Sequence, residues 1–364
     1  MLSSVSMHFH NDKDKKIHRD SNIELLRMLS IWGVIILHYN NQTIGGGLQY
    51  VQEGTLNEAL LLGLQGLCIC VVDLFVLISG YFSCVSNKRS LVKIVGLLVQ
   101  YSFFQMIRYI IEAIIDGSFS WYAMLRAGIP VNYFVILYVS LYIISPYINL
   151  ILRSLSETQV KKMVGLLFGL FAVYPTGVLL VEEIVGPLYG LSSIGISGND
   201  SGYTIINFIL MYIIGAGIKM TNFTVEKRYA AIVLIIDIVV LGIWGKFNSN
   251  VAWIYCNPIV IINAIMLFLL FRQIQLRSDF INELSKASFT CFCVHLFFWD
   301  RCNIQRVVQL NALYMLGHIV ITCLAIYIAS YFIYKIWNMI SKPLFVMLEK
   351  LFKQIDFDFS IKEQ

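Results

Sequence analysis

The chain has 364 residues, of which 58% are hydrophobic and only 13% are charged, and its mean hydropathy is +0.73. Water-soluble proteins carry about 25% charged residues, so this composition excludes a soluble enzyme and predicts a protein with several membrane spans. The net charge of +5 suits contact with anionic membrane lipids, and it gives no reason to expect a nucleic-acid partner.

The chain begins with a polar leader and then becomes apolar. Residues 1–21 lack the apolar run and cleavage site of a signal peptide, so the first span is expected to stay in the mature protein. A span needs roughly 20 apolar residues. Ten segments are predicted to cross the membrane on this criterion: 22–40, 61–82, 91–115, 131–152, 163–181, 203–220, 229–245, 253–271, 285–300 and 312–334. The predicted fold is an all-α integral membrane protein with about ten transmembrane helices.

The Lys and Arg residues between the predicted spans indicate which way the chain faces. If the N-terminus is cytosolic, the inner segments hold 21 of the 27 Lys and Arg residues and the outer segments hold 4. Positive residues gather on the cytosolic side of membrane proteins, so both termini are predicted to be cytosolic. The chain then divides into a cytosolic polar leader (1–21), a transmembrane domain (22–334) and a basic cytosolic tail (335–364), which is expected to form a helix along the membrane surface.

The first predicted span contains RMLSIWGVIILHYN, with a guanidinium and an imidazole among apolar side chains. Arg27 and His38 are eleven residues apart, which places them within about 20° of one helix face and roughly 16 Å apart along its axis. Ionisable side chains in a membrane usually face the bundle interior or a water-filled slot, and we expect these two to share such a slot. The alternative is that Arg27 reaches lipid headgroups and His38 is an interfacial residue.

The second predicted span carries a carboxylate and a pair of small residues. Asp73 is expected at a depth between Arg27 and His38, where it would pair with the former or orient the latter. A structural hydrogen bond to another helix is an equal alternative. Ser79 and Gly80 follow on the same span, and small residues of this kind predict a close approach of two helices.

The remaining polar residues of the spans are interpreted as structural. Arg108 and Glu112 are four residues apart, so an ion pair is favoured over glycan binding. Packing is favoured for Asp237 and His295. The eight cysteines are interpreted as small core residues, because their two Cys-x-Cys pairs lack the spacing of a redox or metal site. We expect no bound catalytic metal.

Six segments, taken in order, carry a resemblance to a known family. They are the Arg-x10-His pattern of the first span, VDLFVLISGYF, SNKRSLVKI, NYFVILYVSLYIISPYINLI, GYTIINFILMYIIGAGIKM and FTCFCVHLFF. This series resembles the membrane-bound acyltransferase-3 family, integral-membrane O-acyltransferases that modify cell-surface glycans. Tyr133 stands where members commonly carry Trp, and Cys293 stands where a Tyr often precedes the late His.

The resemblance implies about ten helices and the transfer of an acyl group, expected to be acetyl. The donor would be cytosolic acyl-CoA, with acetyl-CoA as a co-substrate rather than a bound cofactor. The acceptor would be a hydroxyl of a cell-surface or lipid-linked glycan, such as an exopolysaccharide. The resemblance also implies a multi-pass protein of the cell membrane, expected to be a bacterial cytoplasmic membrane. Direct transfer is favoured over a covalent acyl-Ser79 intermediate, because no base is evident beside that serine.

Candidate residues follow from this hypothesis. His38 would act as the general base that takes the proton of the sugar hydroxyl, with Asp73 as its catalytic partner. The acyl-CoA is expected to bind through Arg27, Arg89, Lys88, Lys93 and Ser79, and the acceptor through Tyr133 and Arg108. A multi-span transporter or flippase of a glycan or small solute is the alternative, because membrane Arg, Asp and His residues also form proton relays and substrate gates.

Overall fold

The computed structural model describes residues 20–86, 88–188, 190–191, 202–352 and 357–358, and most of them are helical. Among them, seven segments are long and apolar enough to cross a membrane. Five are single helices: α2 (Ser21–Asn40), α6 (Leu91–Ile115), α8 (Tyr133–Arg153), α12 (Lys227–Phe247) and α18 (Ala312–Phe352). Two are composite: α4 (Leu56–Cys68) with α5 (Val71–Ser83), and α9 (Glu157–Phe168) with the π-helix η1 (Gly169–Val173) and α10 (Tyr174–Val185).

The other elements of the described chain are shorter. Two of them are apolar helices of 10–17 residues, α11 (Ile205–Met220) and α14 (Pro258–Arg272). The short helices are α3 (Gly47–Tyr50), α7 (Trp121–Ala127), α13 (Ser249–Ala252), α15 (Asp279–Leu284), η3 (Ser285–Ala287), α16 (Ser288–Val294), η4 (His295–Arg301) and α17 (Ile304–Val307). Two strands of two residues each, β1 (Lys88–Arg89) and β2 (Phe357–Asp358), pair antiparallel, with Lys88 opposite Asp358.

The predicted all-α multi-pass protein is confirmed, and seven of the ten expected spans have helices of sufficient length in the described residues. The expected spans 203–220 and 253–271 correspond to the shorter α11 and α14, and 285–300 corresponds to the chain of short helices from η3 to η4. Whether these three cross a membrane stays a prediction, as does the cytosolic side of both termini. The leader lies outside the described residues up to residue 19.

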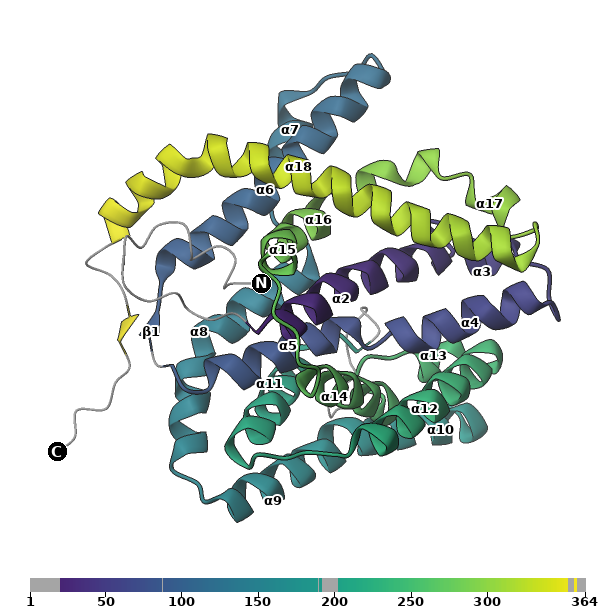
Figure 1. The fold of residues 1–364 in the computed structure, drawn as a ribbon, viewed down its shortest axis with the longest axis vertical. Coiled ribbons are helices and arrows are strands. Elements are labelled where there is room, and N and C mark those ends of the chain that lie inside the picture. The colour runs from purple at the N-terminus through teal and green to yellow at the C-terminus, as the bar shows by residue number, and fades with distance from the viewer. Residues whose placement is uncertain (1–19, 87, 189, 192–201, 353–356, 359–364) are drawn as a thin grey trace.

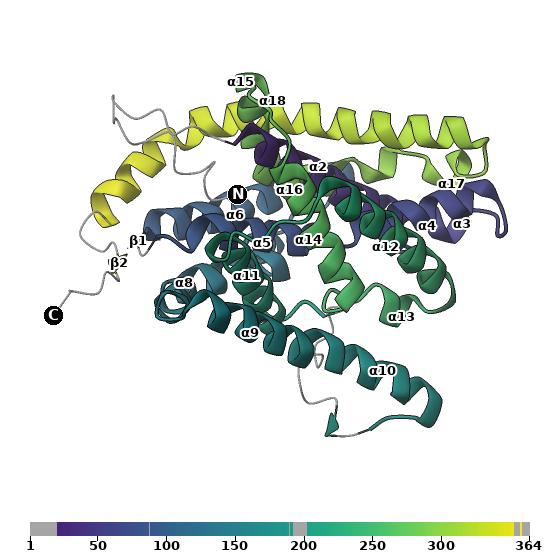
Figure 2. The ribbon, with the colours of Figure 1, turned by 60° about the horizontal axis from the view of Figure 1, so that its bottom comes forward.

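The C-terminal helix is longer than the last predicted span, 312–334. α18 continues from the last predicted span through residues 335–352 as one helix, with Pro343 inside it. The tail helix is therefore an extension of that span rather than an element that begins after it. In Figures 1 and 2, α18 runs along one side of the molecule, whereas α9 and α10 lie on the opposite side.

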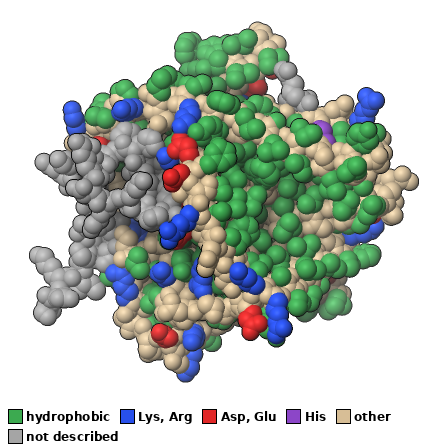
Figure 3. Space-filling model, viewed as in Figure 1, with side chains coloured by type: hydrophobic (Ala, Val, Ile, Leu, Met, Phe, Trp, Pro, Cys, Tyr) green, Lys and Arg blue, Asp and Glu red, His purple; other side chains and the backbone are tan. Residues whose placement is uncertain are grey.

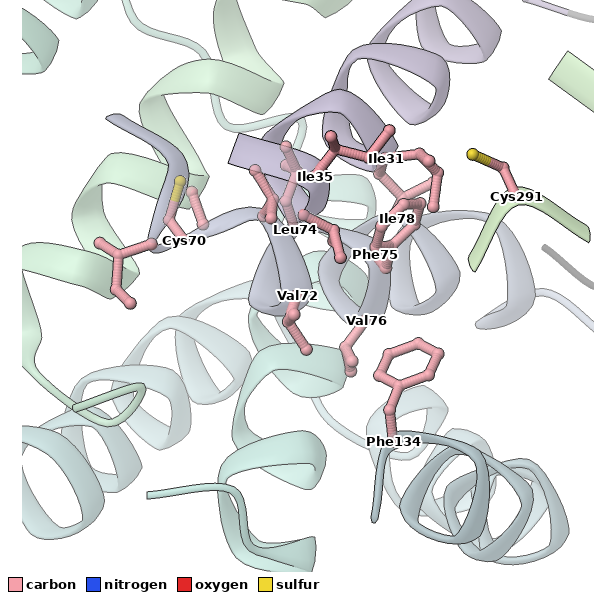
Figure 4. Packing of buried hydrophobic residues seen from close by; sticks show 14 of the residues in the cluster. Ile31, Ile35, Cys70, Val72, Leu74, Phe75, Val76, Ile78, Phe134 and Cys291 are labelled. Atoms are coloured by element: carbon pink, nitrogen blue, oxygen red, sulfur yellow. The ribbon is translucent and has the colours of Figure 1, made fainter. Parts of the chain in front are cut away.

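The first helix occupies the middle of the bundle. α2 contacts α4, α5, α14, α15, α16 and α18, and Figure 1 shows it lying between α18 and α14. Its apolar side chains pack on α5, as Figure 4 shows for Ile31 and Ile35 beside Leu74 and Ile78, all of which are 0–1% exposed. Hydrophobic side chains also cover much of the outer surface in Figure 3, as expected of a protein surrounded by lipid.

Two glycines bring α5 and α11 into close contact, as Ser79–Gly80 predicts. A Cβ on Gly80 would lie 2.1 Å from the carbonyl oxygen of Tyr212, and a Cβ on Gly215 would lie 2.1 Å from that of Leu77. Atoms cannot approach so closely, so only glycine permits this packing. The close contact fixes α5, which carries Asp73 and Ser79.

Substitution at this contact tests its contribution to stability. Gly80→Ala is expected to lower the free energy of unfolding by about 1–3 kcal/mol, because the backbones of α5 and α11 must separate. Thermal unfolding of the purified protein in detergent measures the change. Gly165→Ala on α9 is the matched control, since no atom lies within 4 Å of its added Cβ. Equal stability of the two variants would show that the close contact contributes nothing.

Candidate functional site

His38 lies in the last turn of α2, and its ring is stacked on a second histidine ring. The centroids of the His38 and His295 rings are 5.0 Å apart, and the ring planes differ by 28°. His295 is the first residue of η4, directly after α16. Packing is the role that the sequence favours for His295, but the structure places it against the residue predicted to be the base. Local spacing could not reveal this pair; the one signal was the resemblance of the FTCFCVHLFF segment.

Main-chain carbonyl groups hold the ring of His295. Its Nδ1 lies 2.8 Å from the oxygen of Phe292 and 3.1 Å from that of Cys291. A carbonyl oxygen can only accept a hydrogen bond, so Nδ1 is the nitrogen that carries the hydrogen. The other nitrogen, Nε2, is buried and has no hydrogen-bond partner in the described structure. His295 therefore presents a neutral ring in one fixed orientation.

Arg27 lies toward the other end of α2, where a carboxylate of the same helix holds its side chain. Its Nη1 donates to Glu24 Oε1 at 2.6 Å, and the two side chains are only 11% and 8% exposed. The Ser285 hydroxyl donates to Glu24 Oε2 at 2.7 Å, which ties this pair to η3. Such burial places Arg27 inside the bundle and disfavours contact with lipid headgroups. Glu24 is not among the site residues predicted from the sequence, although its position three residues before Arg27 was a visible signal.

Asp73 has a different partner from those expected. It is fully buried in the first turn of α5, and Asn207 of α11 donates its amide hydrogen to Asp73 Oδ1 at 2.9 Å. In the described structure Oδ2 has no hydrogen-bond partner. The structure thus shows the alternative of a hydrogen bond between helices and no bond from Asp73 to Arg27 or His38 among the described residues, and a catalytic role for Asp73 stays a prediction. The break between α4 and α5 favours a carboxylate here, because a helix N-terminus carries partial positive charge.

The Asp73–Asn207 bond can be tested without reference to activity. Asp73→Asn is expected to leave thermal stability nearly unchanged, because its side-chain carbonyl accepts the same hydrogen bond. Asp73→Leu leaves the amide of Asn207 without that acceptor and is expected to lower the free energy of unfolding by about 1–3 kcal/mol. Thermal melts of both variants give the comparison. A large loss in Asp73→Asn would instead indicate that the negative charge itself is required.

Ser79 joins α5 to α8 through a pair of hydroxyl groups. Its hydroxyl donates to the carbonyl oxygen of Phe75 at 2.9 Å and lies 2.8 Å from the hydroxyl of Tyr138. Because the hydrogen of Ser79 is directed at the carbonyl, Tyr138 is the donor between the two hydroxyls. Direct transfer and a role of Ser79 in binding acyl-CoA both stay predictions.

The basic residues expected to bind acyl-CoA are not equivalent. Arg89 is only 5% exposed and donates to the hydroxyl of Ser145 and to the carbonyl oxygens of Tyr142 and Ser86 at 2.8–3.2 Å. These bonds link β1 to α8 and give Arg89 a structural role, while its part in binding acyl-CoA stays a prediction. Lys88 lies in β1 and Lys93 lies in the first turn of α6. Their roles in binding stay predictions.

The two residues predicted for the acceptor lie on different helices. Tyr133 begins α8, and its ring is stacked on Tyr203 with the centroids 4.2 Å apart. Arg108 Nε lies 2.8 Å from Glu112 Oε1 on α6, which confirms the predicted ion pair. A role of either residue in glycan binding stays a prediction.

The arrangement on α2 suits chemistry between substrates that arrive from opposite ends. One helix carries a cation at one end and an imidazole about 16 Å away, so it can hold an anion and accept a proton at separate points. A water-filled slot joining the two stays a prediction. A surface pocket of about 240 Å³ lies elsewhere, beside the start of α4, and is lined by Gln52, Thr55, Leu56, Asn57, Val308, Gln309, Leu310 and Ala312.

Comparison with known proteins adds one finding. A family model described as an acyltransferase domain matches residues 20–347, nearly the whole chain. The match therefore includes α2 with Arg27 and His38, and it extends beyond His295. No curated protein and no solved structure matches the chain.

Proposed function

Because this chain belongs to the acyltransferase-3 family, we propose that it transfers an acyl group, acetyl in the first instance, from acyl-CoA to a hydroxyl of a cell-surface or lipid-linked glycan. The observation that carries the proposal is the placement of Arg27 and His38 on one buried central helix, with His38 stacked on His295. Membrane acyl transfer follows from the family; the donor, the acceptor and the residue roles are the proposal.

The donor enters at the Arg27 end of α2, which faces the cytosol in the proposed orientation. The guanidinium of Arg27 binds a phosphate of acyl-CoA, because paired N–H donors on a planar cation match phosphate oxygens. In this proposal Lys88 of β1 and Lys93 of α6 contribute further positive charge for the phosphates. The pantetheine arm then extends along α2 toward His38, passing the hydroxyls of Ser79 and Tyr138.

The acceptor hydroxyl reacts at the His38 end. Its oxygen attacks the thioester carbonyl carbon, so a C–O bond forms and the C–S bond breaks. His38 takes the hydroxyl proton during the attack and returns it to the leaving sulfur, which yields free CoA and the acylated glycan. His38 ends in its starting form, and no other reactant is needed.

Transfer of label tests the proposal directly. Purified protein in lipid vesicles is incubated with radiolabelled acetyl-CoA and cell-surface polysaccharide from the same cells, and base-labile label in the polysaccharide is counted. The proposal expects label in the polysaccharide and release of free CoA in equal amounts. If the vesicles accumulate glycan or solute without any acyl transfer, the protein is a transporter and the proposal fails.

A further inference from the structure

The stacked pair of histidines can hold only one positive charge. His295 is 3% exposed and its Nε2 is buried without a hydrogen-bond partner in the described structure, so a proton added there would be poorly stabilised. Two charged rings with centroids 5.0 Å apart would also repel each other. His38 is partly exposed, whereas carbonyl groups fix only the orientation of the His295 ring and leave its buried Nε2 without an acceptor for an added proton. The charge that arises in the pair therefore resides on His38.

A neutral aromatic face attracts a cation lying over it. Such contacts act within about 6 Å of the ring centroid and strengthen when water is excluded. The 5.0 Å stack of His38 on His295 satisfies this distance. Before the reaction both rings are neutral and the attraction is weak, whereas an imidazolium at His38 is stabilised by the face of His295. An interaction that grows as the transition state forms raises the rate of the chemical step.

We propose that His295 is a positioning residue for His38: its fixed neutral ring orients the base and stabilises the imidazolium that His38 becomes when it takes the acceptor's proton. This inference rests on the proposed function, in which the hydroxyl proton moves to His38 as the C–O bond forms. His295 exchanges no proton with the substrate and acts only through the ring of His38.

If the role of His295 were purely structural, a different set of substitutions would be tolerated at this position. The Nδ1 hydrogen of His295 bonds to carbonyl oxygens of Cys291 and Phe292, which lie in the last turns of α16. If that hydrogen bond were the reason for a histidine here, any side chain with a donor at the same point would serve. If the ring face is the reason, a donor without a ring would fail.

Two substitutions separate these roles. His295→Asn keeps a donor near the position of Nδ1 and removes the ring, whereas His295→Phe keeps a ring to stack on His38 and removes the donor. We expect His295→Asn to lower kcat about tenfold with little change in KM for either substrate. His295→Phe is expected to retain kcat within about threefold of the wild type. Thermal melts and size-exclusion profiles of both variants identify any loss of folded protein, and kcat is expressed per folded molecule.

The inference depends on which of the two variants has the higher kcat. It is overturned if His295→Asn is as active as the wild type, if His295→Phe is the less active of the two, or if both lose activity equally. Equal loss would assign the effect to the Nε2 lone pair rather than to the ring face. Turnover by the wild-type protein shows which of the two has failed: if the wild type transfers label, only the inference about His295 is overturned. If the wild-type protein transfers no label, the proposed function fails and the inference fails with it.

Discussion

Replacement of His38 by alanine is expected to reduce acyl transfer by about 10²–10⁴-fold while the protein still folds. A general base contributes a factor of this size, because without it the sugar hydroxyl must attack the thioester before losing its proton. The fold should tolerate the change, since His38 is partly exposed at the end of α2. Turnover of purified protein with labelled acetyl-CoA measures the effect, and a thermal melt confirms folding.

The chain offers a matched histidine as a control. His318 of α18 lies 3.2 Å from the hydroxyl of Tyr39 through its Nδ1 and makes no ring contact with His38 in the described structure. His318→Ala removes a second partly exposed imidazole and is expected to retain most of the activity. If His38→Ala turned over at the wild-type rate, or if both variants fell equally, His38 would not be the base.

Much of the fold could be predicted because hydropathy and length decide it. The third expected span, 91–115, agrees with α6 at both ends. The segment 285–300 could not be assigned in the same way, since most of its residues are apolar but they form η3, α16 and η4 rather than one helix. Hydropathy reports burial, and it does not distinguish one long helix from several short ones packed inside a bundle.

The site was predictable where its residues share one helix. Helical periodicity alone relates Arg27 to His38, and the same rule relates Glu24 to Arg27. The contacts of Asp73 with Asn207 and of His38 with His295 join distant parts of the chain, so no spacing could show them. Arg89 illustrates a different limit: a basic residue between two spans is expected to face solvent, yet here Ser145 and two carbonyl groups bind it inside the protein.

Loss of the positive charge at Arg27 is expected to weaken acyl-CoA binding. In Arg27→Gln, the KM for acetyl-CoA should rise about 10–100-fold, because charge-assisted hydrogen bonds to phosphate contribute about 1.5–3 kcal/mol. The kcat should change less, since the proposed reaction takes place near His38 at the other end of α2. Initial rates over a range of acetyl-CoA concentrations give both constants.

The single substitution has a second effect that must be separated from binding. It leaves the carboxylate of Glu24 buried without the cation that faces it, and breaking a buried pair costs about 3–5 kcal/mol of stability. The double variant Glu24→Gln/Arg27→Gln removes both charges and retains amide groups that can hydrogen-bond to each other. It is expected to recover most of the lost stability but to keep the raised KM.

A substitution of Glu24 tests the role of the Arg27 charge while Arg27 itself stays in place. Glu24→Gln leaves the guanidinium in place and removes the carboxylate that competes with a phosphate for it, so its KM for acetyl-CoA is expected to be equal to or below that of the wild type. Binding by Arg27 is refuted if the double variant shows a wild-type KM, because then the effect of Arg27→Gln arises from instability alone. A raised KM in the double variant together with a low KM in Glu24→Gln assigns the phosphate contact to the guanidinium.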